Sequence, residues 1–259
     1  MSRIKTAFKN KPIFMPYFPL GYPDLDTSIA VIESLAKNGA DLIEVGLSFS
    51  DPLADGPVIQ KATQVALEQG ITVKKSLEAV REVRDRGVEI PLVLMGYYNP
   101  MLAYGLEKFV CEAVEAGADG FIVPDLPVEE SGEFQSALSA GAIEAPLIQM
   151  LAPTTPNRRM ETIAGNAQGF LYLVSVTGVT GERKSISEGL ADLISRVRQF
   201  SSVPVCVGFG ISTPEQARQV GALADGVIVG SACVKAIGAS ATPVETAKQF
   251  AAEFHGALA

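Results

Sequence analysis

The chain has 259 residues, of which 47% are hydrophobic and 19% charged, and its 21 basic and 29 acidic side chains give a net charge of −8. This composition provides enough apolar surface for a large core and excludes intrinsic disorder. The acidic balance argues against nucleic acids and anionic membranes as main partners, because both require a basic face. No apolar run reaches the ~18 residues that a membrane span needs.

The N-terminal segment carries basic residues ahead of an apolar stretch, as signal peptides do. Three prolines interrupt the stretch and no small-residue cleavage site follows, so we expect no signal peptide and a cytoplasmic protein. The three cysteines, Cys111, Cys206 and Cys233, lie far apart in apolar runs. We expect buried thiols in a reducing compartment.

One pattern recurs along the chain: a helical stretch, a glycine or another small residue, and then a short β-branched run. Continuous apolar runs of this kind are typical of strands that are buried on both faces. They predict eight strands, near residues 14–18, 42–46, 91–96, 120–124, 146–151, 169–175, 203–208 and 225–230. Helical patterns follow them, near residues 27–38, 58–69, 105–116, 129–140, 157–165, 188–199, 214–220 and 232–237. Further helices are expected at 74–86 and 244–257, with a short one at 2–9 across the barrel floor.

Strict alternation of strands and helices predicts an α/β protein with parallel strands, and about eight units close into a (β/α)8 TIM barrel. We therefore expect one barrel domain over residues 1–259, with extra N-terminal and peripheral helices. A doubly wound open sheet would need G-x-G-x-x-G after the first strand, and residues 20–24 do not form such a loop.

Glu44 interrupts the second predicted strand near its C-terminal end, where active sites of such barrels lie. Strand alternation places it on the face of Leu42, so it can point into the barrel mouth. Burial there would raise its pKa toward the range of a proton carrier. The alternative is a glutamate that pairs with a buried donor for structural reasons.

Asp55 precedes Gly56 and Pro57 at the end of the following loop. It is either a second carboxylate at the barrel mouth or an ordinary turn residue and helix N-cap. Asp51 is a third candidate carboxylate in this loop, although Ser-Asp-Pro also reads as a turn.

Glycine-rich loops follow the seventh and eighth strands, at residues 207–212 and 229–232. At these places TIM barrels hold a phosphate with backbone N–H groups and a helix N-terminus. Neither loop carries a basic side chain, and none is required. The alternative is that glycine merely permits tight turns.

The loop after the sixth strand, residues 175–184, is long and rich in Gly, Thr and Ser. It fits a lid hinged at Gly178 and Gly181, with Thr180 facing the site, or an ordinary surface loop. Tyr172, within the sixth strand, is either a site residue or a core tyrosine.

Absences narrow the chemistry. The single histidine, His255, disfavours zinc sites and Ser-His-Asp triads, and no predicted strand carries a lysine for a Schiff base. What remains is a phosphorylated substrate handled by two carboxylates, without a metal or a covalent adduct. We expect no cofactor in this chain.

Several segments together resemble the tryptophan synthase α chain: Glu44-Val45-Gly46, residues 49–57 (FSDPLADGP), 124–131 (PDLPVEES), 152–156 (APTTP) and 178–181 (GVTG). The resemblance runs nearly end to end. It implies a lyase of tryptophan biosynthesis that splits indole-3-glycerol phosphate into indole and glyceraldehyde 3-phosphate. It also implies an αββα assembly with a β chain, whose pyridoxal phosphate receives the indole.

By this resemblance, Glu44 is the acid/base and Asp55 the carboxylate that binds the indole N–H. The implied phosphate-binding residues are Gly181, Gly210, Gly230 and Ser231. The implied pocket residues are Tyr17, Leu94, Tyr172, Thr180 and Phe209.

Two positions depart from the family pattern. Ser48 replaces a usual proline in the loop that, with Asp51, would contact the β chain, which puts the strength of coupling in doubt. Gln149 is a polar residue within the fifth strand and has no functional account from sequence. Three alternatives stay open: a stand-alone lyase, a chain that chiefly activates a β chain, and another phosphate-binding barrel such as a sugar-phosphate isomerase.

Overall fold

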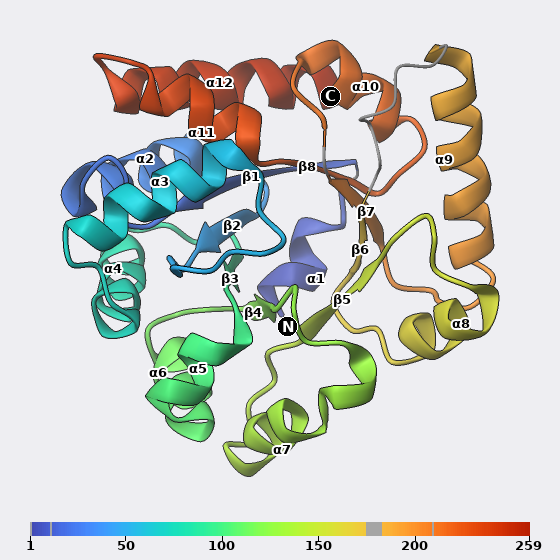
Figure 1. Cartoon of the computed structure of the whole chain (residues 1–259). Coiled ribbons are helices and arrows are strands. Elements are labelled where there is room, and N and C mark those ends of the chain that lie inside the picture. The colour runs from blue at the N-terminus through green and yellow to red at the C-terminus, as the bar shows by residue number, and fades with distance from the viewer. Residues whose placement is uncertain (1, 11, 175–182, 209) are drawn as a thin grey trace.

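A computed structural model describes residues 2–10, 12–174, 183–208 and 210–259, with the side chains of residues 183–188 left out. Its eight parallel strands form a closed barrel in chain order, with β8 pairing β1 (Figure 1). The strands are β1 (Ile13–Pro19), β2 (Ile43–Gly46), β3 (Leu92–Met95), β4 (Gly120–Ile122), β5 (Leu147–Leu151), β6 (Leu171–Val174), β7 (Val205–Gly208) and β8 (Gly226–Val229). Each predicted strand overlaps one of these, so the TIM barrel is confirmed.

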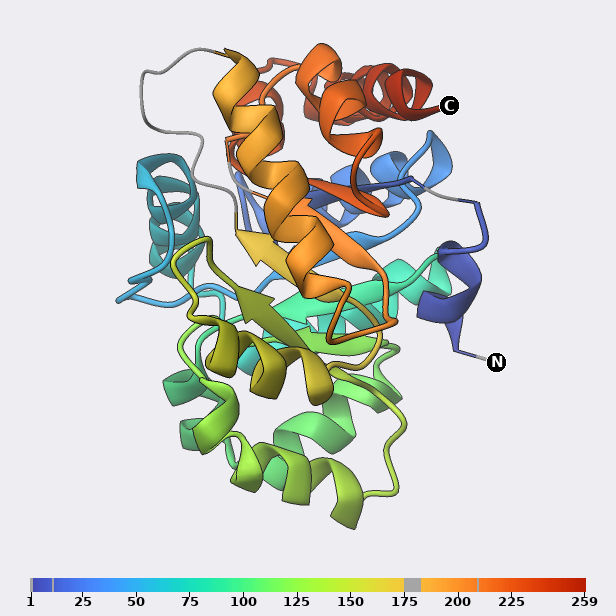
Figure 2. The same ribbon diagram turned by 90° about the vertical axis from the view of Figure 1, so that its right-hand side faces the viewer.

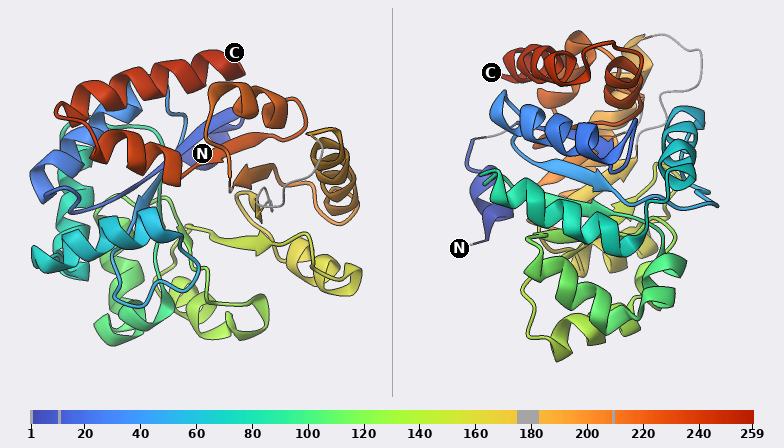
Figure 3. Two further views of the ribbon diagram at one scale, coloured as in Figure 1. Left: turned by 45° about the horizontal axis from the view of Figure 1, so that its top comes forward. Right: turned by 90° about the vertical axis from the view of Figure 1, so that its left-hand side faces the viewer.

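Helices surround the barrel and, as predicted, follow the strands. They are α1 (Arg3–Ala7), α2 (Leu25–Lys37), α3 (Pro57–Glu68), α4 (Val73–Asp85), α5 (Tyr98–Tyr104), α6 (Leu106–Glu115), η1 (Val128–Glu130), α7 (Gly132–Ala140), α8 (Asn157–Gly165), α9 (Arg183–Val197), α10 (Pro214–Gly221), α11 (Ser231–Gly238) and α12 (Pro243–Leu258). None of the described helices is both long and apolar enough to cross a membrane. α12, the last helix, packs along α2 (Figure 3).

One helix, α5, was not predicted. Its first residues, Tyr98-Asn99-Pro100, read as a turn in the sequence, because Asn and Pro favour turns. Pro100 lies in the first helical turn, where a missing backbone N–H breaks no hydrogen bond within the helix. The same residues are therefore compatible with a turn and with a helix start.

The register of the strands decides which side chains enter the barrel. Tyr17, Glu44 and Val93 are paired across β1, β2 and β3 and therefore share one face of the sheet. Val45 and Leu94 are paired on the opposite face, toward the helices. Glu44 thus points into the barrel, as strand alternation predicts.

The barrel floor is covered by α1, at the end of the molecule opposite α3 (Figure 2). Ile4 of α1 is fully buried, and it faces Gly120 at the start of β4. Beside it, Arg3 forms an ion pair with Asp119 at 3.1 Å. The short N-terminal helix expected across the floor is confirmed.

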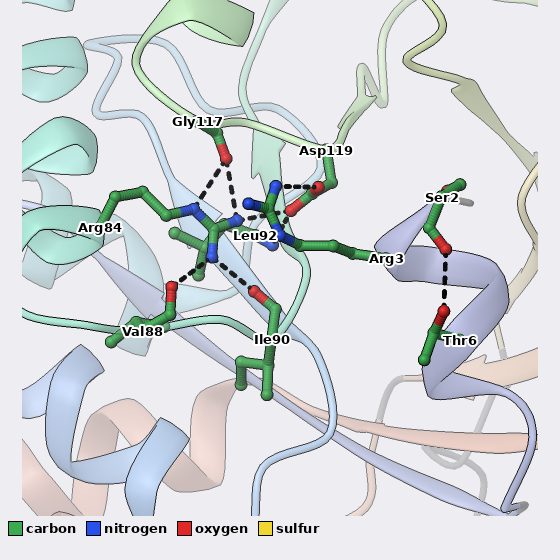
Figure 4. Close-up of polar contacts among 9 residues, drawn as sticks. All are labelled: Ser2, Arg3, Thr6, Arg84, Val88, Ile90, Leu92, Gly117 and Asp119. Atoms are coloured by element: carbon green, nitrogen blue, oxygen red, sulfur yellow. Dashed lines mark hydrogen bonds and ion pairs between the residues drawn. The ribbon is translucent and has the colours of Figure 1, made fainter.

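Arg84, near the end of α4, connects the floor segments (Figure 4). Its guanidinium donates to the Gly117 carbonyl at 3.0 and 2.8 Å and to the carbonyls of Val88 and Ile90, each at 2.7 Å. It also pairs with Asp119 at 2.5 Å. Both side chains of this pair are only about a tenth exposed, so solvent screens their interaction little.

Replacing Arg84 with methionine is expected to lower the free energy of unfolding by about 3 kcal/mol, because buried carbonyls and a carboxylate lose their donors. Urea denaturation measures this change. The control is Arg81→Met on the exposed face of the same helix. Equal stability of the two variants would show that the Arg84 contacts contribute nothing net.

The cysteines only partly follow the sequence expectation. Cys206 and Cys233 are buried, but Cys111 is exposed, so the prediction of three buried thiols was wrong. In α6, Phe109, Val110 and Ala113 form the buried face, and the helical period turns Cys111 away from it.

Gln149 lies on the outer face of β5 and is buried. It lines a cavity of about 320 Å³ together with Gln135, Thr162, Asn166 and Gln168. These neighbours are polar, which gives the amide a polar environment outside the barrel interior.

Candidate active site

A cavity of about 330 Å³ lies at the carboxyl ends of the strands, where TIM-barrel sites are found. It is lined by residues from both halves of the chain: Tyr17, Glu44, Asp55, Gly56, Val58, Ile59, Met95, Tyr172, Gly210, Ile211, Ser212, Ile228, Gly230, Ser231, Ala232 and Lys235. It brings together seven of the residues predicted from sequence. No cluster of three or more His, Cys, Asp or Glu side chains in the described ranges could hold a metal ion.

Glu44 is the buried carboxyl group of this cavity, with 1% of its surface exposed. Its Oε1 atom is buried and has no hydrogen-bond partner among the described residues. Burial, and secondly the charge of Asp55, raise the pKa of Glu44 to about 8. A structural glutamate would have a buried donor for this oxygen, so the unpaired carboxyl favours the functional alternative.

Asp55 lies at the end of the β2–α3 loop. Gly56, not Asp55, is the N-cap of α3, so the alternative of a helix-capping aspartate was wrong. The Asp55 carboxylate instead accepts a hydrogen bond from the Tyr97 hydroxyl at 2.9 Å. Burial raises the pKa of Asp55, although the hydrogen bond from Tyr97 opposes this.

Tyr97 is a residue of the site that the sequence analysis missed. It directly follows Gly96 after β3, and its hydroxyl also accepts a hydrogen bond from the Ala54 backbone N–H at 3.0 Å. Its ring packs against Phe49 with ring centres 5.5 Å apart. Tyr97 thereby holds the loop that carries Asp55, and its place just after a strand end was the signal that could have found it.

The loops after β7 and β8 also contribute to the lining of the cavity. Gly210 follows β7, and Gly230 and Ser231 open α11 without a side-chain cap. The first backbone N–H groups of α11 are therefore free to bind an anion. The prediction that no basic side chain is present here was incomplete, because the α11 helix brings Lys235 to the cavity one turn after Ser231.

Tyr17 and Tyr172 contribute two aromatic side chains with hydroxyl groups to the cavity. Both residues are buried and both line it. Gly46 and Gly208 leave space for them, because a Cβ atom at either glycine would collide with the neighbouring tyrosine hydroxyl. Of the two alternatives for Tyr172, the structure supports the site residue.

Leu94 does not line the cavity, so its prediction as a pocket residue was wrong. It is fully buried on the helix side of β3, and the next residue, Met95, faces the cavity. The sequence assignment was off by one position, which reverses the face in a strand. Gly178, Thr180, Gly181 and Phe209 lie outside the described residues.

The β2–α3 loop also exposes one large apolar side chain to solvent. Leu53 at its tip is 89% exposed, and Asp51 is exposed beside it. Ser48 at the loop start has a buried Oγ with no hydrogen-bond partner among the described residues. The loop that carries Asp55 into the cavity thus has an outer side that faces solvent.

Comparisons with known proteins agree on one family. A family model described as "Tryptophan synthase alpha chain" matches residues 4–258. The tryptophan synthase alpha chain of Chloroflexus aggregans is 47% identical over 239 residues, which cover 90% of this chain and 89% of the relative.

Solved structures give the same result. The tryptophan synthase alpha subunit of Legionella pneumophila superposes with a TM-score of 0.89 at 36% identity, covering 99% of this chain and 98% of the other. A tryptophan synthase chain of Mycobacterium tuberculosis, solved in an aminoacrylate-bound form, gives a TM-score of 0.88 at 32% identity and covers all of both chains. The chain belongs to the tryptophan synthase alpha chain family.

Proposed function

We propose that this chain is the α subunit of a tryptophan synthase and cleaves indole-3-glycerol phosphate to indole and glyceraldehyde 3-phosphate. The observation that carries this proposal is one cavity that holds an unpaired carboxyl group, Glu44, a second carboxylate, Asp55, and the open N-terminus of α11. We take residues 1–259 as one catalytic domain. We also propose a cytoplasmic enzyme, in line with bacterial relatives and two buried thiols.

Each carboxyl group has a distinct role in the proposed reaction. With a pKa of about 8, Glu44 carries a proton at neutral pH and donates it to C3 of the indole ring. The positive charge that develops at the ring N–H is stabilised by the Asp55 carboxylate, which Tyr97 orients.

The bond then breaks in a second step. The Glu44 carboxylate takes the proton of the hydroxyl group next to the breaking bond, and the C–C electron pair returns to the ring. Indole and an aldehyde leave, and Glu44 is again protonated. The chemistry needs no cofactor from this chain.

The phosphate group anchors the substrate in this scheme. Gly210, Gly230 and Ser231 offer backbone N–H groups in the same cavity as the two carboxyl groups, so the glycerol chain would connect the bound phosphate to the reacting carbon atoms. We propose that Gly181, Thr180 and Phe209 contribute to the same site, on the basis of the family pattern alone. Anchoring the substrate by its phosphate end holds the reacting atoms near the carboxyl groups, and this positioning provides much of the rate enhancement.

We propose a β chain as partner, contacted through Ser48, Asp51 and the exposed Leu53 of the β2–α3 loop. Because this loop also carries Asp55, a partner that binds its outer side can change the position of the catalytic carboxylate. Such a coupling makes activity dependent on the complex.

The test is indole release from indole-3-glycerol phosphate by the purified chain, alone and with a saturating β chain. We expect slow release alone and a strong increase with the partner. High activity that ignores the β chain would indicate a stand-alone lyase. Absence of indole under both conditions would overturn the proposed function.

A further inference from the structure

The proposed substrate meets an unfavourable field in this cavity. A phosphate monoester carries nearly two negative charges at neutral pH, because its second pKa is about 6. The cavity contains the Asp55 carboxylate, and the chain has a net charge of −8, whereas Glu44 is protonated at neutral pH and adds little negative charge. The N-terminus of α11 offers only about half a positive charge. A further positive charge would strengthen the binding of the dianion.

Lys235 is the one basic residue among the described residues that line the cavity. It lies four residues after Ser231 on α11, and residues at this spacing share a helix face. The side chain is therefore on the same side as the open first turn that offers backbone N–H groups. No acidic side chain of the described residues forms an ion pair with Lys235, unlike Lys37, which pairs with Glu33, and Lys248, which pairs with Glu245.

We propose that Lys235 supplies the cation of the phosphate subsite and binds the phosphate together with the first turn of α11. The identity of the substrate in this inference rests on the proposed function. The binding of a phosphate ester by Lys235 and α11 does not depend on it. Lys235 is a binding residue and takes no part in proton transfer.

Lysine suits this position for two physical reasons. Its ammonium group has three donors on a flexible stem and binds phosphate as a point charge. The side chain is exposed, so it can reach an incoming anion, and its contribution should decrease with ionic strength. Removing this exposed charge is therefore expected to weaken the affinity for a phosphate dianion by about fivefold to tenfold.

The test compares Lys235→Gln, Lys235→Arg and wild type, with Lys248→Gln as a control that removes the same charge outside the cavity. The probe is sn-glycerol 3-phosphate, and calorimetry measures its Kd between pH 5.5 and pH 7.5. In wild type, affinity should increase as the phosphate loses its second proton, and Lys235→Gln should bind about fivefold to tenfold more weakly at pH 7.5 with a smaller pH effect. Lys235→Arg should restore most of the affinity, and Lys248→Gln should match wild type.

Kinetics give a second readout. Lys235→Gln should raise KM for indole-3-glycerol phosphate more than it changes kcat, and 0.5 M salt should reduce the difference from wild type. Wild-type affinity and pH dependence in Lys235→Gln would overturn the role of Lys235. If the proposed function itself is wrong, the result is different: the wild-type protein releases no indole, whatever the glycerol phosphate titrations show.

Discussion

Asp55→Asn is expected to lower the rate of indole release by roughly a thousandfold or more. The amide occupies the space of the carboxylate but has no charge with which to stabilise the protonated indole ring. Its orientation also becomes ambiguous, because the Tyr97 hydroxyl donates to a carboxylate oxygen in the present site. Steady-state kcat/KM for indole-3-glycerol phosphate measures the effect.

The fold and the phosphate subsite should survive this substitution. Affinity for glycerol phosphate should stay within about twofold or increase slightly, because one nearby negative charge is lost. Asp85→Asn, at the exposed end of α4, is the matched control and should retain wild-type turnover. Retained turnover in Asp55→Asn would remove Asp55 from the mechanism.

Glu44→Gln is expected to reduce kcat by roughly 10³- to 10⁴-fold, because glutamine cannot donate or accept the transferred proton. Substrate affinity should change little, since the proposed phosphate contacts come from the loops after β7 and β8 and not from Glu44. A change confined to KM would instead make Glu44 a binding residue. In wild type, kcat should decline above about pH 8, where Glu44 loses its proton.

The same substitution should change stability in a pH-dependent manner. Glu44 has a pKa near 4.5 when unfolded and about 8 when folded, so the folded state binds more protons between these values. Wild-type stability therefore decreases as the pH rises through this interval, and Glu44→Gln is free of this loss. Denaturant titrations should show the variant gaining about 4 kcal/mol relative to wild type between pH 5 and pH 9. If the stability difference between the variant and wild type does not change with pH, the pKa of Glu44 is not raised in the folded state.

The eight strands and the inward direction of Glu44 were predictable because they depend on local patterns. Continuous apolar runs mark strands buried on both faces, and the period of two fixes which side chains share a face. The two glycine-rich loops at residues 207–212 and 229–232 were predictable because they follow strand ends, and chain order alone specifies that position. The choice of Gly210, Gly230 and Ser231 within them came from the family resemblance.

Other features depend on contacts between distant segments. Tyr97 meets Asp55 across 42 positions, and nothing local in either loop indicates that hydrogen bond. Leu94 and Met95 are both apolar, so only the register of β3 against β2 could decide which faces the cavity. Lys235 is part of the cavity because of where α11 begins.

The Arg84 contacts at the barrel floor have a consequence for how this chain can vary over evolutionary time. Three of its four partner residues, Val88, Ile90 and Gly117, contribute a backbone carbonyl, so the identity of their side chains does not enter the hydrogen bonds. Val88 and Ile90 can therefore mutate without disturbing this tie. Gly117 cannot, because its φ is +107° and a Cβ atom there would collide with the Arg84 side chain. Arg84 and Asp119 must change together or not at all. Sequence drift at the barrel floor is thus permitted at Val88 and Ile90 and restricted at Arg84, Gly117 and Asp119, and the loops at the mouth can diversify while this closure is kept.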